Sequence, residues 1–293
     1  MNNLKPFIKW VGGKTQLLPD IINNLPDDKS EITTYIEPFI GGGSVLLNIL
    51  NYFPNLNKVI INDFNPILIQ AYLEIKNNPK KLMAYLDNLQ DIYYKTEDKQ
   101  SLYYKIRNKF NNSSNLSEKA YLFIFLNKTC FNGLYRENKS GYFNVPFNNA
   151  KRPLFYDKEN ILNISKYLNK YNVQCYNSSY ENMQKYVTRN NTFVYLDPPY
   201  RPITKSSAFT AYTKSGFNDD SQRQLKLFCD KIDEKNSFFM LSNSDPKNTD
   251  VTDSFFDDLY EDYIILRVKA KRNINSDGEG RGKINEILVK NYE

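Results

Sequence analysis

The sequence contains no histidine. This absence excludes Ser-His-Asp hydrolysis, Cys-His nucleophiles, histidine general bases and metal sites built on imidazole. The three cysteines lie far apart and form no CxxC pair, so neither a zinc site nor a disulfide framework is predicted. No apolar run approaches the ~20 residues that a membrane span needs, and residues 1–14 lack a signal-peptide core. We therefore expect a soluble, cytoplasmic protein that needs no metal and no membrane.

The pattern of apolar residues divides the 293-residue chain into three regions. Residues 1–76 alternate short apolar runs (33–38 and 58–63) with a glycine-rich turn, which is typical of a βαβ unit in a parallel sheet. Residues 77–171 carry helical patterns at 82–95 and 119–128, followed by a Gly/Asn-rich stretch. Residues 172–293 return to strand-like runs at 173–177, 192–200, 237–243, 263–268 and 285–292. We predict one α/β sheet domain, 1–76 with 172–293, interrupted by a mainly helical insertion.

Positive charge is concentrated in the predicted insertion. Residues 95–170 hold 14 Lys/Arg and 6 Asp/Glu, an excess of eight, whereas the whole chain has a net charge of +6. Such a basic insertion on a near-neutral scaffold is typical of contact with a phosphate backbone, although a solvated lysine-rich helical face gives the same count. A second basic stretch, 267–283, is loop-like in pattern and is a further candidate for gripping the same polymer.

A glycine-rich loop and an acid follow the first two predicted strands. The loop is EPFIGGGS at 37–44, and Asp63 closes the next strand, twenty positions after Gly43. This spacing is typical of an acidic side chain that meets ribose hydroxyls in a nucleotide-binding βαβ unit. Because Leu46 stands where the dinucleotide fingerprint has its third glycine, the loop predicts an adenosine-containing ligand and leaves nicotinamide dinucleotide and S-adenosylmethionine both open.

The segment GGKT at 12–15 is only half of a phosphate-binding loop. A Walker A motif needs glycine at position 8, where this chain has Ile8. An ATPase is therefore not favoured. We predict instead that the glycine pair lets Trp10 and Lys14 shape the floor of a cofactor pocket.

The motif YLDPPY ends the predicted strand at 192–200 with an acid, two prolines and an aromatic ring. Ligands bind at the carboxyl ends of strands in open α/β sheets. Proline lacks an N–H, so Pro198 and Pro199 present carbonyl oxygens without competing donors. Asp197 adds a carboxylate acceptor, and Tyr200 adds a flat face for stacking. This set of groups suits an exocyclic amine on a planar base whose nitrogen attacks the methyl group of a sulfonium.

The order of motifs over nearly the whole chain resembles the Dam-type DNA adenine-N6 methyltransferases, the D12 class, which include adenine methylases of GATC restriction-modification systems. The motifs are FIKWVGGK, YIEPFIGGGS, INDFN, FNGLYREN, FNVPF, YLDPPY, SAFTAYT and GKINEILVKNY. The resemblance implies a Rossmann-like S-adenosylmethionine-dependent sheet with an inserted, mainly helical DNA-recognition domain. It also implies a recognition hairpin near 131–147.

The resemblance and the motif chemistry together assign roles to individual residues. The catalytic set is Asp197, Pro198, Pro199 and Tyr200, placed around a flipped adenine. The set expected to bind S-adenosyl-L-methionine is Trp10, Lys14, Pro38, Phe39, Gly41, Gly43, Asp63, Tyr180 and Asp197. The set expected to bind DNA is Asn132, Leu134, Arg136, Pro146, Lys151 and Arg152.

The chain departs from the family pattern at two places. Ser178-Ser179-Tyr180 replaces Gly-Asp-Phe, which removes an acidic cofactor contact while an aromatic ring persists. Residues 148–150 read Asn-Asn-Ala in place of Gly-Arg-Tyr, which removes a phosphate contact and a stacking tyrosine.

The expected function is methyl transfer from S-adenosylmethionine to adenine N6 in double-stranded DNA, within GATC. The expected location is the cytoplasm, on the nucleoid through DNA binding. A cognate restriction endonuclease that acts on the same site without direct contact is a candidate partner. Three alternatives are a nicotinamide dehydrogenase, a catalytically silent DNA-binding module, and a methyltransferase acting on RNA or on a protein amine. The dehydrogenase gives the Asp-Pro-Pro-Tyr motif no role, and a silent module would not need a complete cofactor set.

Overall fold

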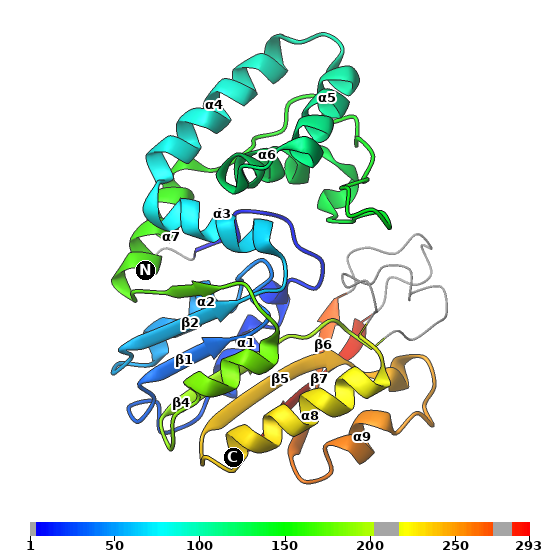
Figure 1. Ribbon diagram of the computed structural model, residues 1–293. Coiled ribbons are helices and arrows are strands. Elements are labelled where there is room, and N and C mark those ends of the chain that lie inside the picture. The colour runs from blue at the N-terminus through cyan, green and yellow to red at the C-terminus, as the bar shows by residue number, and fades with distance from the viewer. Residues whose placement is uncertain (1–3, 202–216, 272–282) are drawn as a thin grey trace. The chain divides into compact units, whose positions relative to one another are not determined.

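The computed structural model describes residues 4–201, 217–271 and 283–293 (Figure 1). The motif SAFTAYT at 207–213 and most of the basic stretch 267–283 lie outside these residues. The chain forms two compact units. Unit 1 comprises Met1–Gly13, Gly41–Asn48 and Asp63–Asn177, and unit 2 comprises Lys14–Ile40, Ile49–Asn62 and Ser178–Glu293. The predicted division at 77 and 171, between a sheet domain and a helical insertion, stays a prediction.

The described residues form a seven-stranded sheet in the order β3-β2-β1-β4-β5-β7-β6. The strands are β1 (Thr34–Glu37), β2 (Lys58–Asn62), β3 (Gln174–Tyr176), β4 (Thr192–Leu196), β5 (Phe238–Ser244), β6 (Ile264–Lys271) and β7 (Lys283–Lys290). β1 pairs in parallel with β2 and β4, and β4 with β5, whereas β7 runs antiparallel to β5 and β6. Each strand coincides with a run predicted from the sequence, and the Rossmann-like α/β fold class is confirmed.

The central strands β1 and β4 are buried along their whole length, and apart from Glu37 their side chains are aromatic, β-branched or apolar. β1 lies between β2 and β4. The strands β2 and β3 extend the sheet on one side of β1 and β4 and β5 on the other, so the strand order reverses at β1. This reversal is the topological switch point at which doubly wound sheets bind ligands. Pro38 and Asp197 follow the carboxyl ends of these two neighbouring strands.

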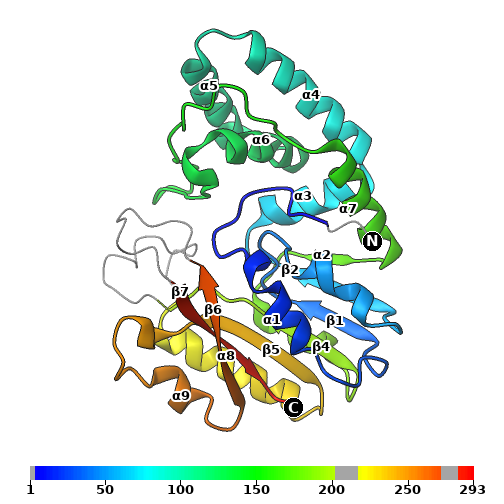
Figure 2. The ribbon, with the colours of Figure 1, turned by 180° about the vertical axis from the view of Figure 1, so that it is seen from behind.

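The helix α8 (Asp219–Asp233) packs on β5 in unit 2 (Figure 1). Its N-cap is Asn218, whose side chain accepts a hydrogen bond from the Ser221 N–H, and Asp219 and Asp220 lie in the first turn, where carboxylates favour the helix dipole. Seen from behind, the short helix α1 (Leu18–Asn23) lies against the other face of the sheet (Figure 2). Unit 2 also contains α9 (Phe255–Leu259) and the 3₁₀ turns Lys14–Gln16, Leu50–Tyr52, Tyr180–Tyr186 and Pro246–Asn248.

Unit 1 is mainly helical, with α6 at its centre. The helices are α2 (Leu46–Ile49), α3 (Pro66–Asn77), α4 (Pro79–Lys95), α5 (Lys99–Asn112), α6 (Leu116–Thr129) and α7 (Lys158–Lys170), followed after α6 by the 3₁₀ turn Phe131–Gly133. α3 begins at the N-cap Asn65, with Pro66 in the first turn. Its buried Glu74 accepts hydrogen bonds of 2.6 Å from both Ser117 and Tyr121. These bonds fix α3 against α6 and lower the pKa of Glu74 against the opposing effect of its burial.

Candidate functional site

In unit 1, a turn at Trp10–Gly13 positions an indole ring over the glycine-rich loop. The Gly13 N–H donates to the Trp10 carbonyl oxygen (3.3 Å), and Gly12 has a φ of 80°, as the third residue of such a turn requires. A Cβ on Gly41 would lie 2.8 Å from Cδ1 of Trp10. A Cβ on Gly43 would lie 2.3 Å from the Tyr72 hydroxyl oxygen. The glycines are therefore required, in this structure, by the close packing of two aromatic rings.

Asp63 follows β2 and is held by the backbone of unit 1. Its Oδ2 accepts a hydrogen bond from the Gly41 N–H (3.1 Å), and its Oδ1 accepts one from the Asn65 N–H (2.9 Å). Desolvation raises the pKa of Asp63 to about 6, although these backbone donors act in the opposite direction. The carboxylate is thus oriented before any ligand binds, and each oxygen has a further lone pair that suits a ribose hydroxyl.

The residues around the loop fit an adenosine that carries no phosphate. Dinucleotide folds place the pyrophosphate at the N-terminus of a crossover helix. Here the glycine-rich loop leads into α2, which has only four residues and continues as a 3₁₀ turn. The carboxylate of Asp63 suits hydroxyl groups rather than phosphates. The shortness of α2 favours S-adenosylmethionine over a nicotinamide dinucleotide, whereas a ribose contact of Asp63 suits both.

In unit 2, Asp197 follows β4 and forms a buried ion pair. Lys14 Nζ lies 2.6 Å from Asp197 Oδ1, and the Lys14 side chain is only 2% exposed. The Ser242 hydroxyl of β5 donates to the same oxygen (3.1 Å). Desolvation raises the pKa of Asp197, while the charge of Lys14 and the two hydrogen bonds lower it. The net effect is a pKa above the usual aspartate value, and the ammonium opposes the effect of burial, which favours the neutral form.

The other members of YLDPPY are also held by distant residues of unit 2. The Tyr200 hydroxyl donates to Oε2 of Glu286 on β7 (2.5 Å), and Lys14 Nζ lies 4.7 Å from the Tyr200 ring centroid. The fully buried Gln222 of α8 donates to the Pro199 carbonyl oxygen (3.4 Å). Pro198 lies between Asp197 and Pro199 in the same irregular segment. The geometry presents a carboxylate, carbonyl oxygens and an aromatic ring together at the end of β4.

An aromatic cluster in unit 2 contains two of the predicted cofactor residues. The rings of Phe39 and Tyr180 lie 5.1 Å apart, and Phe217 contacts Phe39 edge-on at 6.2 Å. Pro38 precedes Phe39 at the end of β1. Tyr180 follows Ser179, the position at which the acidic family residue is missing, and the Ser179 hydroxyl donates to Glu181. The cluster offers flat apolar surface for a planar ring.

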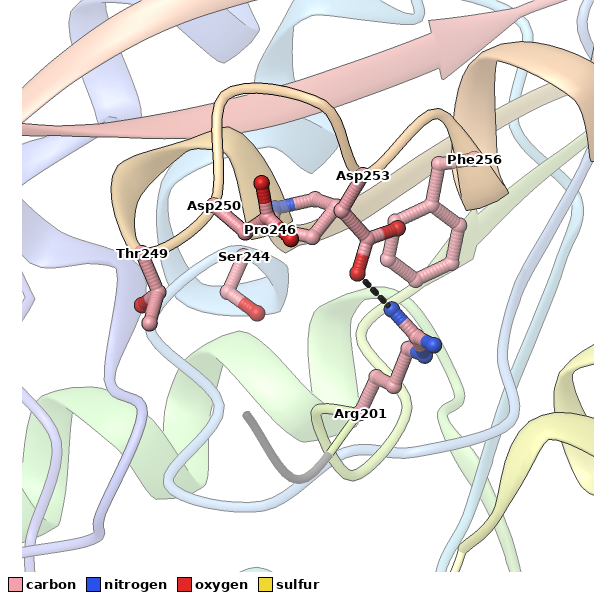
Figure 3. Close-up of a pocket in the computed structure, with 7 residues that line it drawn as sticks. All are labelled: Arg201, Ser244, Pro246, Thr249, Asp250, Asp253 and Phe256. Atoms are coloured by element: carbon pink, nitrogen blue, oxygen red, sulfur yellow. Dashed lines mark hydrogen bonds and ion pairs between the residues drawn. The ribbon is translucent and has the colours of Figure 1, made fainter. Parts of the chain in front are cut away.

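A cavity of about 180 Å³ in unit 2 is lined in part by Arg201, the residue that follows YLDPPY (Figure 3). The Arg201 guanidinium binds Asp219 through Nε (2.7 Å) and Nη2 (3.1 Å), and Asp253 through Nη1 (2.6 Å). Because these carboxylates neutralise the guanidinium, the cavity does not have the charge of a phosphate site. It is lined by Arg201, Ser244, Pro246, Thr249, Asp250, Asp253 and Phe256.

The residues predicted to bind DNA lie on the segment after α6 in unit 1. Antiparallel bridges at Cys130–Phe147 and Glu137–Phe143 fold this segment back on itself. Asn132 has a φ of 53°, in the left-handed region, which lets the chain turn sharply after α6. Arg136 is exposed, and its Nε donates to Asn144 Oδ1 (2.7 Å). Pro146, Lys151 and Arg152 are also exposed, and Leu134 is half-buried.

Two lysines that the sequence analysis did not single out lie beside the same segment. Asn127 binds the Lys9 backbone on both sides, through its Oδ1 (2.9 Å) and Nδ2 (2.8 Å), and Nδ2 also donates to the Gly133 carbonyl oxygen. Burial, with a smaller effect of the Lys9 charge, lowers the pKa of Lys128 to about 8. Two basic side chains, those of Lys9 and Lys128, therefore lie beside this segment in addition to Arg136 of the FNGLYR motif.

The sequence analysis also missed Ser242, Gln222 and Glu286 in unit 2. A signal was present for Gln222, a polar side chain on the otherwise apolar buried face of α8, which is a position that needs a partner. The partner could not be read from the pattern. Among the described residues, no group of three or more Cys, Asp or Glu side chains could hold a metal ion. Within those residues, none of the helices is long and apolar enough to cross a membrane.

Comparison with known proteins gives matches over almost the whole chain. Residues 10–274 match the family model of the D12 class N6 adenine-specific DNA methyltransferases. The type II methyltransferase M.MjaIII of Methanocaldococcus jannaschii is 44% identical, with 99% of each chain covered. The type II methyltransferase M1.LlaDCHI of Lactococcus lactis is 37% identical, over 99% of this chain and 96% of that protein. The DNA adenine methylase of Escherichia coli K12 is 32% identical, over 99% of this chain and 96% of that protein.

Proposed function

The chain belongs to the D12 class of N6 adenine-specific DNA methyltransferases, and on this basis we propose that its methyl donor is S-adenosyl-L-methionine and its site is GATC. We further propose that the target adenine is flipped out of the duplex into a pocket formed by residues 197–200. The observation that carries the proposal is the buried Lys14–Asp197 ion pair at the end of β4.

The ion pair supports the proposed binding of the amine because it leaves a defined set of acceptors. Lys14 and Ser242 both bind Oδ1 of Asp197, so Oδ2 is proposed to accept one N6 hydrogen. The Pro199 carbonyl accepts from Gln222, so the Pro198 carbonyl is proposed to accept the other. Tyr200 then stacks on the base. With both hydrogens held, the N6 lone pair is directed away from the ring and is free to attack.

S-adenosylmethionine supplies an electrophilic methyl group on a sulfonium when it is bound. The chain's residues bind and orient both reactants. Asp63 accepts the ribose hydroxyls, and Phe39 and Tyr180 supply flat surface for the adenine ring of the cofactor. Asp197 and Pro198 present negative oxygen atoms to the nitrogen as it acquires positive charge, which lowers the barrier. Holding N6 next to the methyl group supplies the rest of the reduction in the barrier.

Double-stranded DNA is supported as substrate by the basic segment of unit 1. Adenine N6 is paired inside a duplex and cannot reach a methyl donor, so the base must leave the stack. Asn132, Leu134, Arg136 and Pro146 are proposed to read the site, and Lys151 and Arg152 to bind phosphates. Lys9 and Lys128 add charge at the same segment. We propose that the protein acts on nucleoid DNA, with a restriction endonuclease cutting the same site as a candidate partner without direct contact.

The test is transfer of labelled methyl groups to a GATC duplex and to duplexes that each carry one substituted base pair. Protected and unprotected products are then separated by nucleases that distinguish methylated from unmethylated GATC. We expect label on N6 of adenine in GATC, with each substitution lowering the rate. Equal labelling of all duplexes would contradict GATC specificity. Labelling of RNA or protein, with none of DNA, would contradict the proposed substrate.

A further inference from the structure

Glu286 is the one carboxylate of β7, and it contacts the tyrosine that ends YLDPPY. The Tyr200 hydroxyl donates to its Oε2 over 2.5 Å. β7 is the strand inserted antiparallel between β5 and β6, and Glu286 lies opposite Ser244 on β5 and Val268 on β6. The insertion therefore delivers a carboxylate to the same end of the sheet as Asp197.

The surroundings of Glu286 make it costly to leave its carboxylate without a hydrogen-bond donor. Burial raises the pKa of Glu286, and the nearby Asp197 acts in the same direction, whereas Lys14 and the Tyr200 hydroxyl lower it. A half-buried carboxylate in such a site is stable only with a hydrogen-bond donor. Conversely, the phenol ring of Tyr200 has two ends: one is the backbone of the motif and the other is this carboxylate. Together they fix the long axis of the ring and hence its position.

We propose that Glu286 is a positioning residue for methyl transfer, which acts by holding the Tyr200 ring at the position where the target base stacks. This inference rests on the proposed function, because it takes Tyr200 as the stacking surface. Glu286 itself touches neither reactant in this account. Its effect passes entirely through one hydrogen bond, so it requires an acceptor at this place rather than a negative charge.

Four variants separate this role from the alternatives: Glu286→Ala, Glu286→Gln, Tyr200→Phe and the double variant Tyr200→Phe/Glu286→Ala. Glutamine keeps an acceptor oxygen and removes the charge, and phenylalanine keeps the ring and removes the donor. The matched control is Glu261→Ala, an exposed glutamate of the same unit. The measurement is the single-turnover rate of methyl transfer to duplex DNA with the full-length protein.

We expect Glu286→Ala and Tyr200→Phe each to lower the rate about tenfold or more, comparable to losing a contact that orients a reactant. In the Tyr200→Phe background, Glu286→Ala should change the rate less than twofold, because the bond is already absent. Glu286→Gln should stay within about threefold of the wild type. Independent, multiplying effects in the double variant would overturn the proposal, and so would a Gln variant as slow as the Ala variant.

A second readout is independent of the reaction. The thermal midpoints of the wild type, Glu286→Ala, Tyr200→Phe and the double variant form a double-mutant cycle for this hydrogen bond. We expect the double variant to be no less stable than the less stable single variant, and summed losses would overturn the contact. Failure of wild-type protein to methylate DNA would instead contradict the proposed function, which keeps the two failures distinguishable.

Discussion

The ammonium of Lys14 lies 2.6 Å from Oδ1 of Asp197, in a site where the lysine is almost fully excluded from solvent. One residue comes from a 3₁₀ turn near the start of the chain and the other from the carboxyl end of β4. Burial raises the pKa of the carboxyl group, and the ammonium lowers it. The protonation state of the proposed amine acceptor therefore depends on a residue far away in sequence.

Removing the Asp197 carboxylate should abolish most of the methyl-transfer activity. Asp197→Ala deletes one acceptor for the N6 hydrogens and leaves Lys14 without its partner. We expect the single-turnover rate to fall at least ~10²-fold, as for loss of a preorganised transition-state contact. Asp220→Ala, on the exposed surface of α8, is the control. A folded Asp197→Ala protein that kept more than about a tenth of wild-type turnover would contradict the role of Asp197.

Removing the ammonium should change the pH dependence of the rate. Without Lys14 the pKa of Asp197 rises further, so the carboxyl becomes neutral at a higher pH and the rate falls earlier on acidification. We expect the acid limb of the pH–rate profile in Lys14→Met to move upward by about one unit or more. Lys14→Arg keeps a cation and should move it less. An unchanged acid limb in Lys14→Met would show that the ion pair does not control the ionisation.

Cofactor binding should weaken on acidification because the pKa of Asp63 is raised to about 6. Above this pH the ionised carboxylate accepts ribose hydroxyls, and below it the neutral carboxyl is a weaker acceptor. We expect the Kd for S-adenosylmethionine, measured by calorimetry, to rise by up to about tenfold between pH 7 and pH 5. Asp63→Asn should bind more weakly at pH 7, by about 1.5–3 kcal/mol, and show little pH dependence. DNA affinity measured without cofactor should hardly change in Asp63→Asn or Asp63→Ala.

Arg136 should determine discrimination at the guanine of the site. Its Nε is occupied by Asn144, which orients the guanidinium on the exposed segment. Two parallel hydrogen bonds to guanine O6 and N7 are worth about 1–3 kcal/mol against a wrong base. We expect Arg136→Ala to lose selectivity at guanine in methylation of single-base-substituted duplexes at fixed salt. Lys151→Ala and Arg152→Ala should instead weaken all duplexes alike and flatten the salt dependence. Equal slowing of every duplex by Arg136→Ala would make this residue a backbone contact.

The strands and the ends of the strands could be predicted because their signals are local. β1 and β4 are short apolar runs that stop at proline or at Asp-Pro-Pro, and each side chain alternates its face with the next. The exposed segment after α6 was likewise marked by its glycine and asparagine residues. The close packing of Trp10 and Tyr72 against Gly41 and Gly43 could not be predicted, because both rings lie far from the loop in the sequence.

The sequence by itself determined the α/β class, the order of the strands along the chain, and the placement of Asp63 and Asp197 at the carboxyl ends of β2 and β4. Only the tertiary structure decided that Lys14 pairs with Asp197, that Gln222 binds the Pro199 carbonyl, and that Glu286 binds Tyr200. These partners lie on different elements, and no spacing in the chain relates them. Strand order and register bring them together, because burial of the apolar faces selects one arrangement and the polar groups on those elements must then find their hydrogen bonds within it.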